Sequence, residues 1–489
     1  EVGPVELQTR IFKRFTRGNF MGPYTERYEL DGMDRNTLSI FPNYLTFVTA
    51  LESERWPALN LALQIYLKDR YSNPISSYRW LFTDLSKSEQ INLELKKNSL
   101  ASNSKLPDKA EDNEDDISNY ELITAKGEYL FSVFRARYGD VEFNALLDSI
   151  VNSNRQRSFS LTDFDSAMLS DFNETIIDDV DDWYNGNNLP GFLVKDLETY
   201  KVMVDEHTKY QVKFKISNPE LADGIITINI DLYDPNSQNN SSDEPPDFSK
   251  KVFIRAQSAK EVGFIFNTEP VRMNIYTHIS LNLPNNIIYD FGAFNETRKT
   301  DVFDEMVDCE PFENLVKDGE IIVDNEDSLF NYYHESKKSY LKTLIDSKQD
   351  PGYGYSRIRW WSPPPEWERV LRSGFYGKYV RSAMYTSSGK GERTTTWEAP
   401  IDKEGYYDVY CHVEKINVSR RRQRKKADYN FSVFHEGGVE KINLTDGDLE
   451  NGWNYLGTFF VTPSTAKVEL NNSSVGTMVF ADAIKWIEN

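Results

Sequence analysis

The stretch Gly405-Tyr406-Tyr407-Asp408-Val409-Tyr410 is one of several short strand-like segments near the end of this 489-residue chain. Such segments recur from Phe375 to Trp486, separated by turns rich in Gly, Asn and Ser. Repeated short strands with regular turns are typical of β-sandwiches and barrels. We therefore predict an all-β domain over residues 371–489.

Two other regions precede this domain, and their hydrophobic periods differ. Between residues 120 and 190 apolar side chains fall on single helix faces, which predicts helices. From Tyr200 to Tyr289 apolar and polar residues alternate, which predicts a small β-sandwich. The predicted fold class is a multidomain α+β protein: a mostly helical region (1–195), an accessory β-sandwich (196–295), an acidic linker with a helix around Leu329–Ile345 (296–370) and a terminal β-sandwich (371–489).

A polar segment interrupts the first region. Residues 86–119 are rich in Ser, Asn, Lys, Asp and Glu, and include the acidic run from Glu111 to Asp116. Such a composition buries too little apolar surface to offset the entropy of ordering. We expect a mobile surface insertion there, with residues 100–116 dispensable for stability.

The charge of the chain restricts its partners. The formal net charge is −21 at pH 7, which divides into −22 for residues 1–370 and +1 for residues 371–489. Nucleic-acid binding needs a basic surface, so we expect no nucleic-acid partner. No stretch approaches the ~20 apolar residues of a membrane span, and Cys309 and Cys411 are too few for a disulfide framework. The chain begins at Glu1, so we expect a processed form or a fragment, with any membrane association supplied by a missing portion.

Three strings carry a first family resemblance. They are Gly32-Met33-Asp34-Arg35-Asn36, Lys126-Gly127-Glu128-Tyr129-Leu130 and Leu189-Pro190-Gly191-Phe192. In order and spacing they are similar to the rear part of zinc aminopeptidases of the M1 type, over roughly residues 20–290. The resemblance implies that Gly32, Met33, Asp34 and Asn36 are the relic of a substrate-binding loop.

The departures from that family concern its metal. M1 chemistry needs His-Glu-x-x-His on a helix, where two histidines one turn apart bind zinc. This chain has five histidines, and no two of them lie four residues apart. We therefore expect no catalytic residues, no zinc or other metal, and no cofactor. The alternatives are a fragment of an active M1-type zinc metallopeptidase, or the envelope domain of a transporter-associated M1-like protein.

A second resemblance covers the β-rich end. Its strings are Phe375-Tyr376-Gly377-Lys378-Tyr379, Gly405-Tyr406-Tyr407-Asp408-Val409-Tyr410, Gly452-Trp453-Asn454-Tyr455-Leu456-Gly457 and Val479-Phe480-Ala481-Asp482-Ala483-Ile484-Lys485-Trp486. They resemble the golvesin C-terminal-like domain, which is found on large envelope proteins including xanthan lyases. The resemblance implies a jelly-roll β-sandwich with a carbohydrate-binding type of fold.

Two features of this domain are candidates for binding. Six of the seven residues from Arg420 to Lys426 are cationic, and Arg420, Arg421, Arg422 and Arg424 make up an expected site for an anionic partner. The alternative is a solvated hairpin loop. Tryptophans 397, 453 and 486 could stack on sugars, but strand aromatics usually pack inward, so we expect them in the core. Of the adjacent Trp360 and Trp361, one is expected to face outward.

These observations together predict a non-catalytic binding or assembly protein of the bacterial envelope or cell surface. Its expected partners are an envelope protein complex or an anionic polysaccharide. The expected location is the periplasm or the cell surface, as for a secreted protein.

Overall fold

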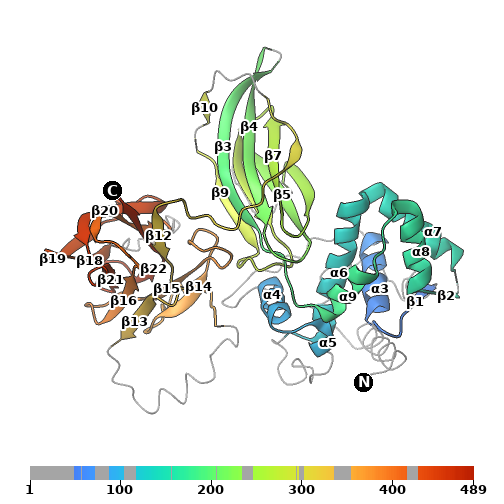
Figure 1. Ribbon diagram of the computed structural model, residues 1–489, viewed down its shortest axis with the longest axis horizontal. Coiled ribbons are helices and arrows are strands. Elements are labelled where there is room, and N and C mark those ends of the chain that lie inside the picture. Colours follow the sequence, from blue (N-terminus) through green and yellow to red (C-terminus); the bar gives the residue numbers. More distant parts are fainter. Residues whose placement is uncertain are drawn as a thin grey trace.

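The computed structural model describes residues 49–56, 58–71, 87–103, 117–155, 157–204, 206–233, 246–292, 294–296, 302–334, 354–415 and 428–489. They form three parts in chain order: a helical part, a middle β-sandwich and a terminal β-sandwich. The middle sandwich stands between the other two (Figure 1). Strands make up more of the described chain than helices do, so the protein is mainly β.

The helical part is built on a shared apolar core. Its helices include α6 and α7, whose buried faces contain Phe131, Phe134 and Phe143, as the spacing predicted. Helix α6 begins at a capping box, in which Ser118 and Glu121 satisfy each other's backbone N–H groups. The elements are β1 (Thr49–Glu52), α3 (Leu59–Tyr71), α4 (Lys87–Lys97), α5 (Leu100–Asn103), α6 (Asn119–Tyr138), α7 (Asp140–Ser153), β2 (Arg157–Ser160), α8 (Leu161–Phe172) and α9 (Ile177–Asn185).

The middle sandwich consists of two sheets that face each other. One has the strand order β10-β3-β4-β7-β11 and the other β6-β5-β8-β9. Alternation in β4 and β5 directs Val212, Phe214, Ile226 and Ile228 into the core between them. The strands are β3 (Leu193–Val204), β4 (His207–Asn218), β5 (Gly224–Leu232), β6 (Phe248–Ile254), β7 (Ser258–Phe266), β8 (Pro270–Tyr276), β9 (Asn286–Asp290), β10 (Asn295–Glu296) and β11 (Met306–Cys309).

The terminal sandwich has two main sheets and a smaller third one. The strand orders are β12-β23-β17-β20, β13-β16-β21-β18-β19 and β14-β15-β22. Trp397 and Trp486 lie in the core between the two main sheets. The strands are β12 (Glu320–Val323), β13 (Phe330–His334), β14 (Glu368–Leu371), β15 (Ser382–Ser387), β16 (Arg393–Glu398), β17 (Gly405–Val413), β18 (Tyr429–His435), β19 (Gly438–Leu444), β20 (Gly452–Val461), β21 (Lys467–Asn471), β22 (Met478–Ala481) and β23 (Ile484–Glu488).

The expected linker contributes strands to both sandwiches. Strand β11 pairs with β7, whereas β12 pairs with β23 and β13 with β16. The helix expected around Leu329–Ile345 is wrong for residues 330–334, which form β13, and residues 335–345 lie outside the described residues. The physical reason is packing: the Phe330 ring lies 5.3 Å from that of Trp397, and cross-strand packing outweighs a weak helical pattern.

The expected mobile insertion also needs a correction. Residues 87–103 form helices α4 and α5, and residues 104–116 lie outside the described residues. Leu93, Leu95 and Leu100 are buried, so this polar segment carries enough apolar side chains to dock on the rest of the protein.

The three parts meet at one junction. Leu93 of α4, Leu283 of the middle sandwich and Leu371 of β14 form a small buried cluster. The Leu283 N–H donates to the Tyr379 carbonyl at 2.9 Å, and the Tyr379 hydroxyl donates to Glu220 at 2.6 Å. The segment from Leu371 to Tyr379 therefore fastens the terminal sandwich to both other parts.

Candidate functional site

The outer surface of the sheet β12-β23-β17-β20, here called the platform sheet, is unusually aromatic. In β17 the odd-numbered Tyr407, Val409, Cys411 and Val413 point into the core, so the even-numbered residues face outward. The aromatic face consists of the outward rings of β17 and β20, which are Tyr406, Tyr410, His412, Trp453, Tyr455 and Phe460.

The rings of the aromatic face are arranged in three cross-strand pairs along β17 and β20. The ring centres of Tyr406 and Phe460 lie 5.2 Å apart, and those of Tyr410 and Tyr455 lie 5.3 Å apart. His412 and Trp453 form the third pair at 5.0 Å, in an edge-to-face geometry. Cross-strand aromatic pairs stabilise a sheet and hold each other in place, so these rings have defined positions.

A β-bulge directs two of these rings outward. The register between β17 and β20 shifts between Val409 and Tyr410, where Val409 faces Gly457 and Tyr410 faces Tyr455. The residue left over is Leu456, which is buried. Because side chains alternate along a strand, the extra residue reverses the parity of β20 and turns Tyr455 to the outside.

Gly457 permits this bulge. Its φ is +146°, a backbone conformation that side-chain-bearing residues rarely adopt. A Cβ at this position would also lie 2.7 Å from the Phe459 ring. The glycine is therefore needed where the strand changes parity.

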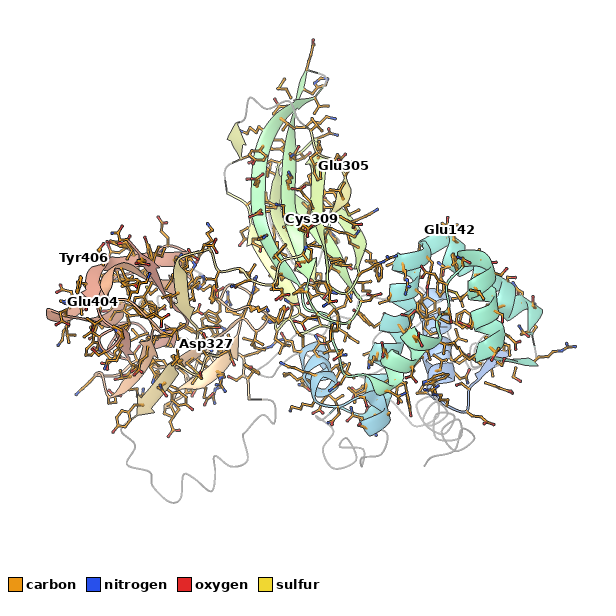
Figure 2. All side chains as sticks on the ribbon, viewed as in Figure 1. Glu142, Glu305, Cys309, Asp327, Glu404 and Tyr406 are labelled. Atoms are coloured by element: carbon orange, nitrogen blue, oxygen red, sulfur yellow. The ribbon has the colours of Figure 1, made fainter. Side chains whose placement is uncertain are left out.

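The aromatic face is open to solvent. Tyr406 is 60% exposed and Tyr455 is 52% exposed. Figure 2 places Tyr406 on the outer surface of the terminal sandwich, on the side away from the middle sandwich. Exposed aromatic rings grouped on one surface indicate a binding site more strongly than scattered ones do.

A lysine lies between two of the rings. The Lys485 Nζ is 4.7 Å from the centre of the Trp453 ring and 5.2 Å from that of Tyr410. It also pairs with Glu320 of β12 at 3.1 Å. Both charged side chains are mostly shielded from solvent, so the pair fixes the two rings from the side.

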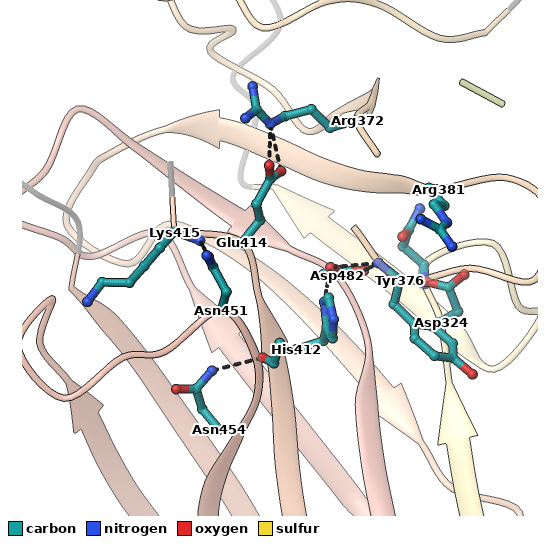
Figure 3. Close-up of polar contacts among 12 residues, drawn as sticks. Asp324, Arg372, Tyr376, Arg381, His412, Glu414, Lys415, Asn451, Asn454 and Asp482 are labelled. Carbon is teal, nitrogen blue, oxygen red and sulfur yellow. Dashed lines mark hydrogen bonds and ion pairs between the residues drawn. The ribbon is translucent and has the colours of Figure 1, made fainter. Parts of the chain in front are cut away.

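A buried carboxylate supports the other end of the row. The His412 Nδ1 lies 2.7 Å from Asp482 Oδ2, and the Tyr376 backbone N–H donates to both oxygens of that carboxylate at 3.2 Å (Figure 3). The Tyr376 ring in turn lies 5.2 Å from that of Trp453. Asp482 thus positions both His412 and the loop that carries Tyr376.

Two carboxyl groups beneath this surface have raised pKa values. Burial raises the pKa of Asp482, while contact with His412 opposes the shift. Burial and the neighbouring Asp482 raise the pKa of Asp324, which follows β12. Nearby, Arg372 Nε donates to both oxygens of Glu414, at 2.7 and 2.6 Å. We interpret these groups as supports of the face.

One carboxylate lies on the aromatic face itself. Asp408 sits between Tyr406 and Tyr410 on the outer side of β17 and accepts a hydrogen bond from the Thr458 hydroxyl. The Thr458 oxygen also lies 2.6 Å from the Tyr455 hydroxyl. The carboxylate in the middle of the row can therefore accept further hydrogen bonds.

The site residues expected from the sequence are not among these. Gly32, Met33, Asp34 and Asn36, and likewise Arg420, Arg421, Arg422 and Arg424, lie outside the described residues. Burial of Trp397 and Trp486 is confirmed, whereas Trp453 was expected in the core and lies on the aromatic face. Trp361 is 66% exposed and Trp360 is half-buried, as expected for adjacent residues.

The strings behind the M1 resemblance make structural contacts. The Trp183 Nε1–H donates to the Lys126 carbonyl at 2.7 Å, and Lys126 Nζ donates to the Gly186 carbonyl at 3.0 Å. A Cβ on Gly127 would lie 2.4 Å from the Cβ of Ala62, so only glycine fits between α6 and α3. Burial lowers the pKa of Lys126 to about 8.

In the part of the chain that the structure describes, no three His, Cys, Asp or Glu side chains converge so as to hold a metal ion. None of the described helices is long and apolar enough to cross a membrane.

The chain has partial similarities to known proteins. A Paenibacillus xanthan lyase is similar at 14% identity and a TM-score of 0.24, with 61% of this chain and 26% of that chain covered. A Bacteroides uniformis beta-glucuronidase is similar at 10% identity and a TM-score of 0.17, with 57% and 27% covered. This chain thus spans about a quarter of either protein, at 26% and 27%. No curated protein matches it. Residues 365–488, which contain strands β14 to β23, match the Golvesin C-terminal domain.

Proposed function

We propose that the protein is a non-catalytic binding protein of the bacterial envelope or cell surface, and that its terminal sandwich binds a polysaccharide on the aromatic face. The observation that carries this proposal is the row of paired rings on one open side of the platform sheet. A Golvesin C-terminal domain fits a cell-surface, carbohydrate-related role.

The chemistry of the face suits a sugar chain. A pyranose ring has apolar C–H groups on its flat sides and hydroxyl groups at its edges. Aromatic rings offer apolar surface to the former, and Asp408 and His412 offer hydrogen-bonding groups to the latter. Because the rings are held by cross-strand pairing and by Lys485, little conformational entropy is lost when a ligand binds.

The helical part and the middle sandwich serve, in this proposal, as a rigid scaffold. The M1 resemblance is then one of shape without metal chemistry. Its strings support this interpretation, because Lys126 and Gly127 fasten α6 to its neighbours. Gly191 lies against the Tyr379 ring, where a Cβ would come within 2.6 Å, so the third string belongs to the junction.

The cationic run from Arg420 to Lys426 gives a second proposed contact. It connects β17 to β18, and β17 belongs to the platform sheet. Several arginines acting together on an anionic polymer or an acidic protein would bind with strong salt dependence. Changing Arg420, Arg421, Arg422 and Arg424 to Ser should abolish retention by anionic envelope extract at low salt. Equal retention of both proteins would leave the run as a solvated loop.

The main test is a screen of polysaccharides with a matched pair of variants. One variant carries Tyr406→Ala, Trp453→Ala and Tyr455→Ala on the aromatic face. The control carries Tyr332→Ala and Tyr333→Ala on β13, whose side chains are 50% and 63% exposed but lie on the other main sheet. We expect the face variant to lose at least about tenfold in affinity, since stacked rings contribute roughly 1 kcal/mol each.

The control variant should bind as the wild type does, and both variants should remain folded at the temperature of the binding assay. The proposal fails if the wild type binds none of the polysaccharides. It also fails if the β13 variant loses as much affinity as the face variant. Incubation with the bound polysaccharide should release no shorter fragments, and their release would contradict the non-catalytic assignment.

A further inference from the structure

We infer that the ligand of the aromatic face is an internal stretch of a neutral glycan chain that lies along the β17–β20 seam. This inference rests on the proposed function and specifies its ligand. It is carried by the length of the row of rings, by the charges on the face and by the unpartnered nitrogen of His412.

The row is too long for a single sugar. The outward positions of β17 run from Tyr406 to His412, and six residues of extended strand span about 20 Å. Each ring pair covers only a part of that length. A terminal sugar would occupy one pair and leave the others empty, whereas a chain of several sugars can contact all three.

The charges on the face disfavour an acidic sugar. The cation Lys485 is already paired with Glu320 at 3.1 Å, so it adds no net positive charge. Asp408 stands in the middle of the row, and the group that donates a hydrogen bond to it is a neutral hydroxyl, that of Thr458. A uronate placed there would face Asp408 without a neutralising partner. A sugar hydroxyl, in contrast, can donate a hydrogen bond to the carboxylate.

One end of the row offers a further polar contact. His412 uses Nδ1 to contact Asp482, so its Nε2 lies on the opposite side of the ring. Among the described residues, no hydrogen bond to Nε2 is found, and the side chain keeps 12% of its surface exposed. It lies at the His412–Trp453 end of the row, where a sugar hydroxyl that reaches this exposed part can bond to it.

Chain length provides the first test. We would measure by titration calorimetry the affinity of the whole protein for a disaccharide, a tetrasaccharide and a hexasaccharide of one neutral glycan found in the screen. The hexasaccharide should bind at least about tenfold more tightly than the disaccharide. The two ends of the row are tested by Tyr406→Ala and Trp453→Ala. Each substitution should lower the affinity for the hexasaccharide several-fold, and at most one of them should lower the affinity for the disaccharide.

Charge provides the second test, made in a protein in which Arg420, Arg421, Arg422 and Arg424 are Ser, so that the cationic run cannot contribute. That protein should bind the neutral glycan about tenfold more tightly than polygalacturonate. The isosteric Asp408→Asn should lower the ratio of the affinity for the neutral glycan to the affinity for polygalacturonate. The Tyr332→Ala variant serves as the control and should leave it unchanged.

The outcomes separate the two proposals. If no glycan binds the wild type, the proposed function itself is wrong. If glycans bind through the face but the disaccharide binds as tightly as the hexasaccharide, a terminal sugar is the ligand and this inference is overturned. A preference for polygalacturonate that Asp408→Asn leaves unchanged would overturn it as well.

Discussion

The two sandwiches both place a lysine against aromatic rings, but only one of them leaves the rings uncovered. In the middle sandwich, Lys213 Nζ lies 4.8 Å from the Phe303 ring centre and 2.9 Å from Glu261. In the terminal sandwich, Lys485 lies 4.7 Å from the Trp453 ring centre and 3.1 Å from Glu320. The local chemistry is nearly the same in both places.

The difference lies in what covers each sheet. Phe303 belongs to the described stretch 302–305, which precedes β11. Its N–H donates to Gln211, and the Gly263 N–H donates to the Glu305 carbonyl at 2.9 Å. A Cβ on Gly263 would lie 2.2 Å from the Phe303 carbonyl oxygen, so the glycine admits the segment. The middle sandwich therefore uses its lysine–aromatic contact internally, whereas the platform sheet keeps its rings available to another molecule.

The largest expected effect compares a buried tryptophan with an exposed one. Trp486 lies in the core with no exposed surface, so Trp486→Ala should lower the free energy of unfolding of the terminal sandwich by about 3–5 kcal/mol. Trp361→Ala, at a 66% exposed side chain, should change it by less than about 0.5 kcal/mol. Urea unfolding measures both. Equal losses of unfolding free energy in the two variants would show that burial does not determine how much a tryptophan contributes to stability.

Acid should act on the two sandwiches in opposite directions. Burial lowers the pKa of His278 in the middle sandwich to about 4, so stability is lost as the pH falls from about 6.5 to about 4, by up to roughly 3 kcal/mol. Burial raises the pKa of Asp324 and Asp482 in the terminal sandwich. Those groups bind more protons folded than unfolded, so stability is lost as the pH rises above about 4.

Thermal melting from pH 4 to pH 7 should resolve these two trends. His278→Gln should reduce the dependence of the melting temperature on pH for the middle sandwich. Asp324→Asn should reduce the same dependence for the terminal sandwich. Parallel trends in both sandwiches, or slopes that survive both substitutions, would contradict the assignment of these groups.

The smallest effects distinguish a covered ring from an open one. Phe303→Ala should lower the free energy of unfolding by about 1–2 kcal/mol, because the ring covers Lys213 and is partly buried. Tyr455→Ala should lower it by less than about 0.5 kcal/mol, yet weaken glycan binding several-fold. The comparison between the sandwiches breaks down if Tyr455 proves as important for stability as Phe303.

The sequence predicted the large divisions of the fold because those depend on periodicity. Helical spacing around Phe131 and Phe143 and strand alternation around Val212 are local signals, and the helices and strands appear where they were expected. Strand β12 was missed because it has four residues and its partner β23 lies far away in the chain, as Glu320 faces Ile487. Local patterns carry no information about such a partner.

The candidate site could not be read from the sequence for a related reason. Tyr406 and Tyr407 are adjacent and chemically identical, yet Tyr406 is 60% exposed and Tyr407 is 3% exposed. Which of them points outward depends on the core that β17 faces. In β20 the bulge at Gly457 reverses the alternation, so a constant period of two would assign Tyr455 to the wrong side. The resemblance identified the domain, but only its three-dimensional structure distinguishes the two faces of the sheet.

That bulge also changes how sequences of related domains should be compared. A relative could keep every tyrosine and tryptophan of this strand, lack the one extra residue, and turn its rings into the core. Aromatic content would then be a poor guide to binding, and a one-residue deletion would count for more than a substitution. Relatives that bind glycans should instead be recognised by the spacing from the glycine at position 457 to the aromatic residues on either side of it.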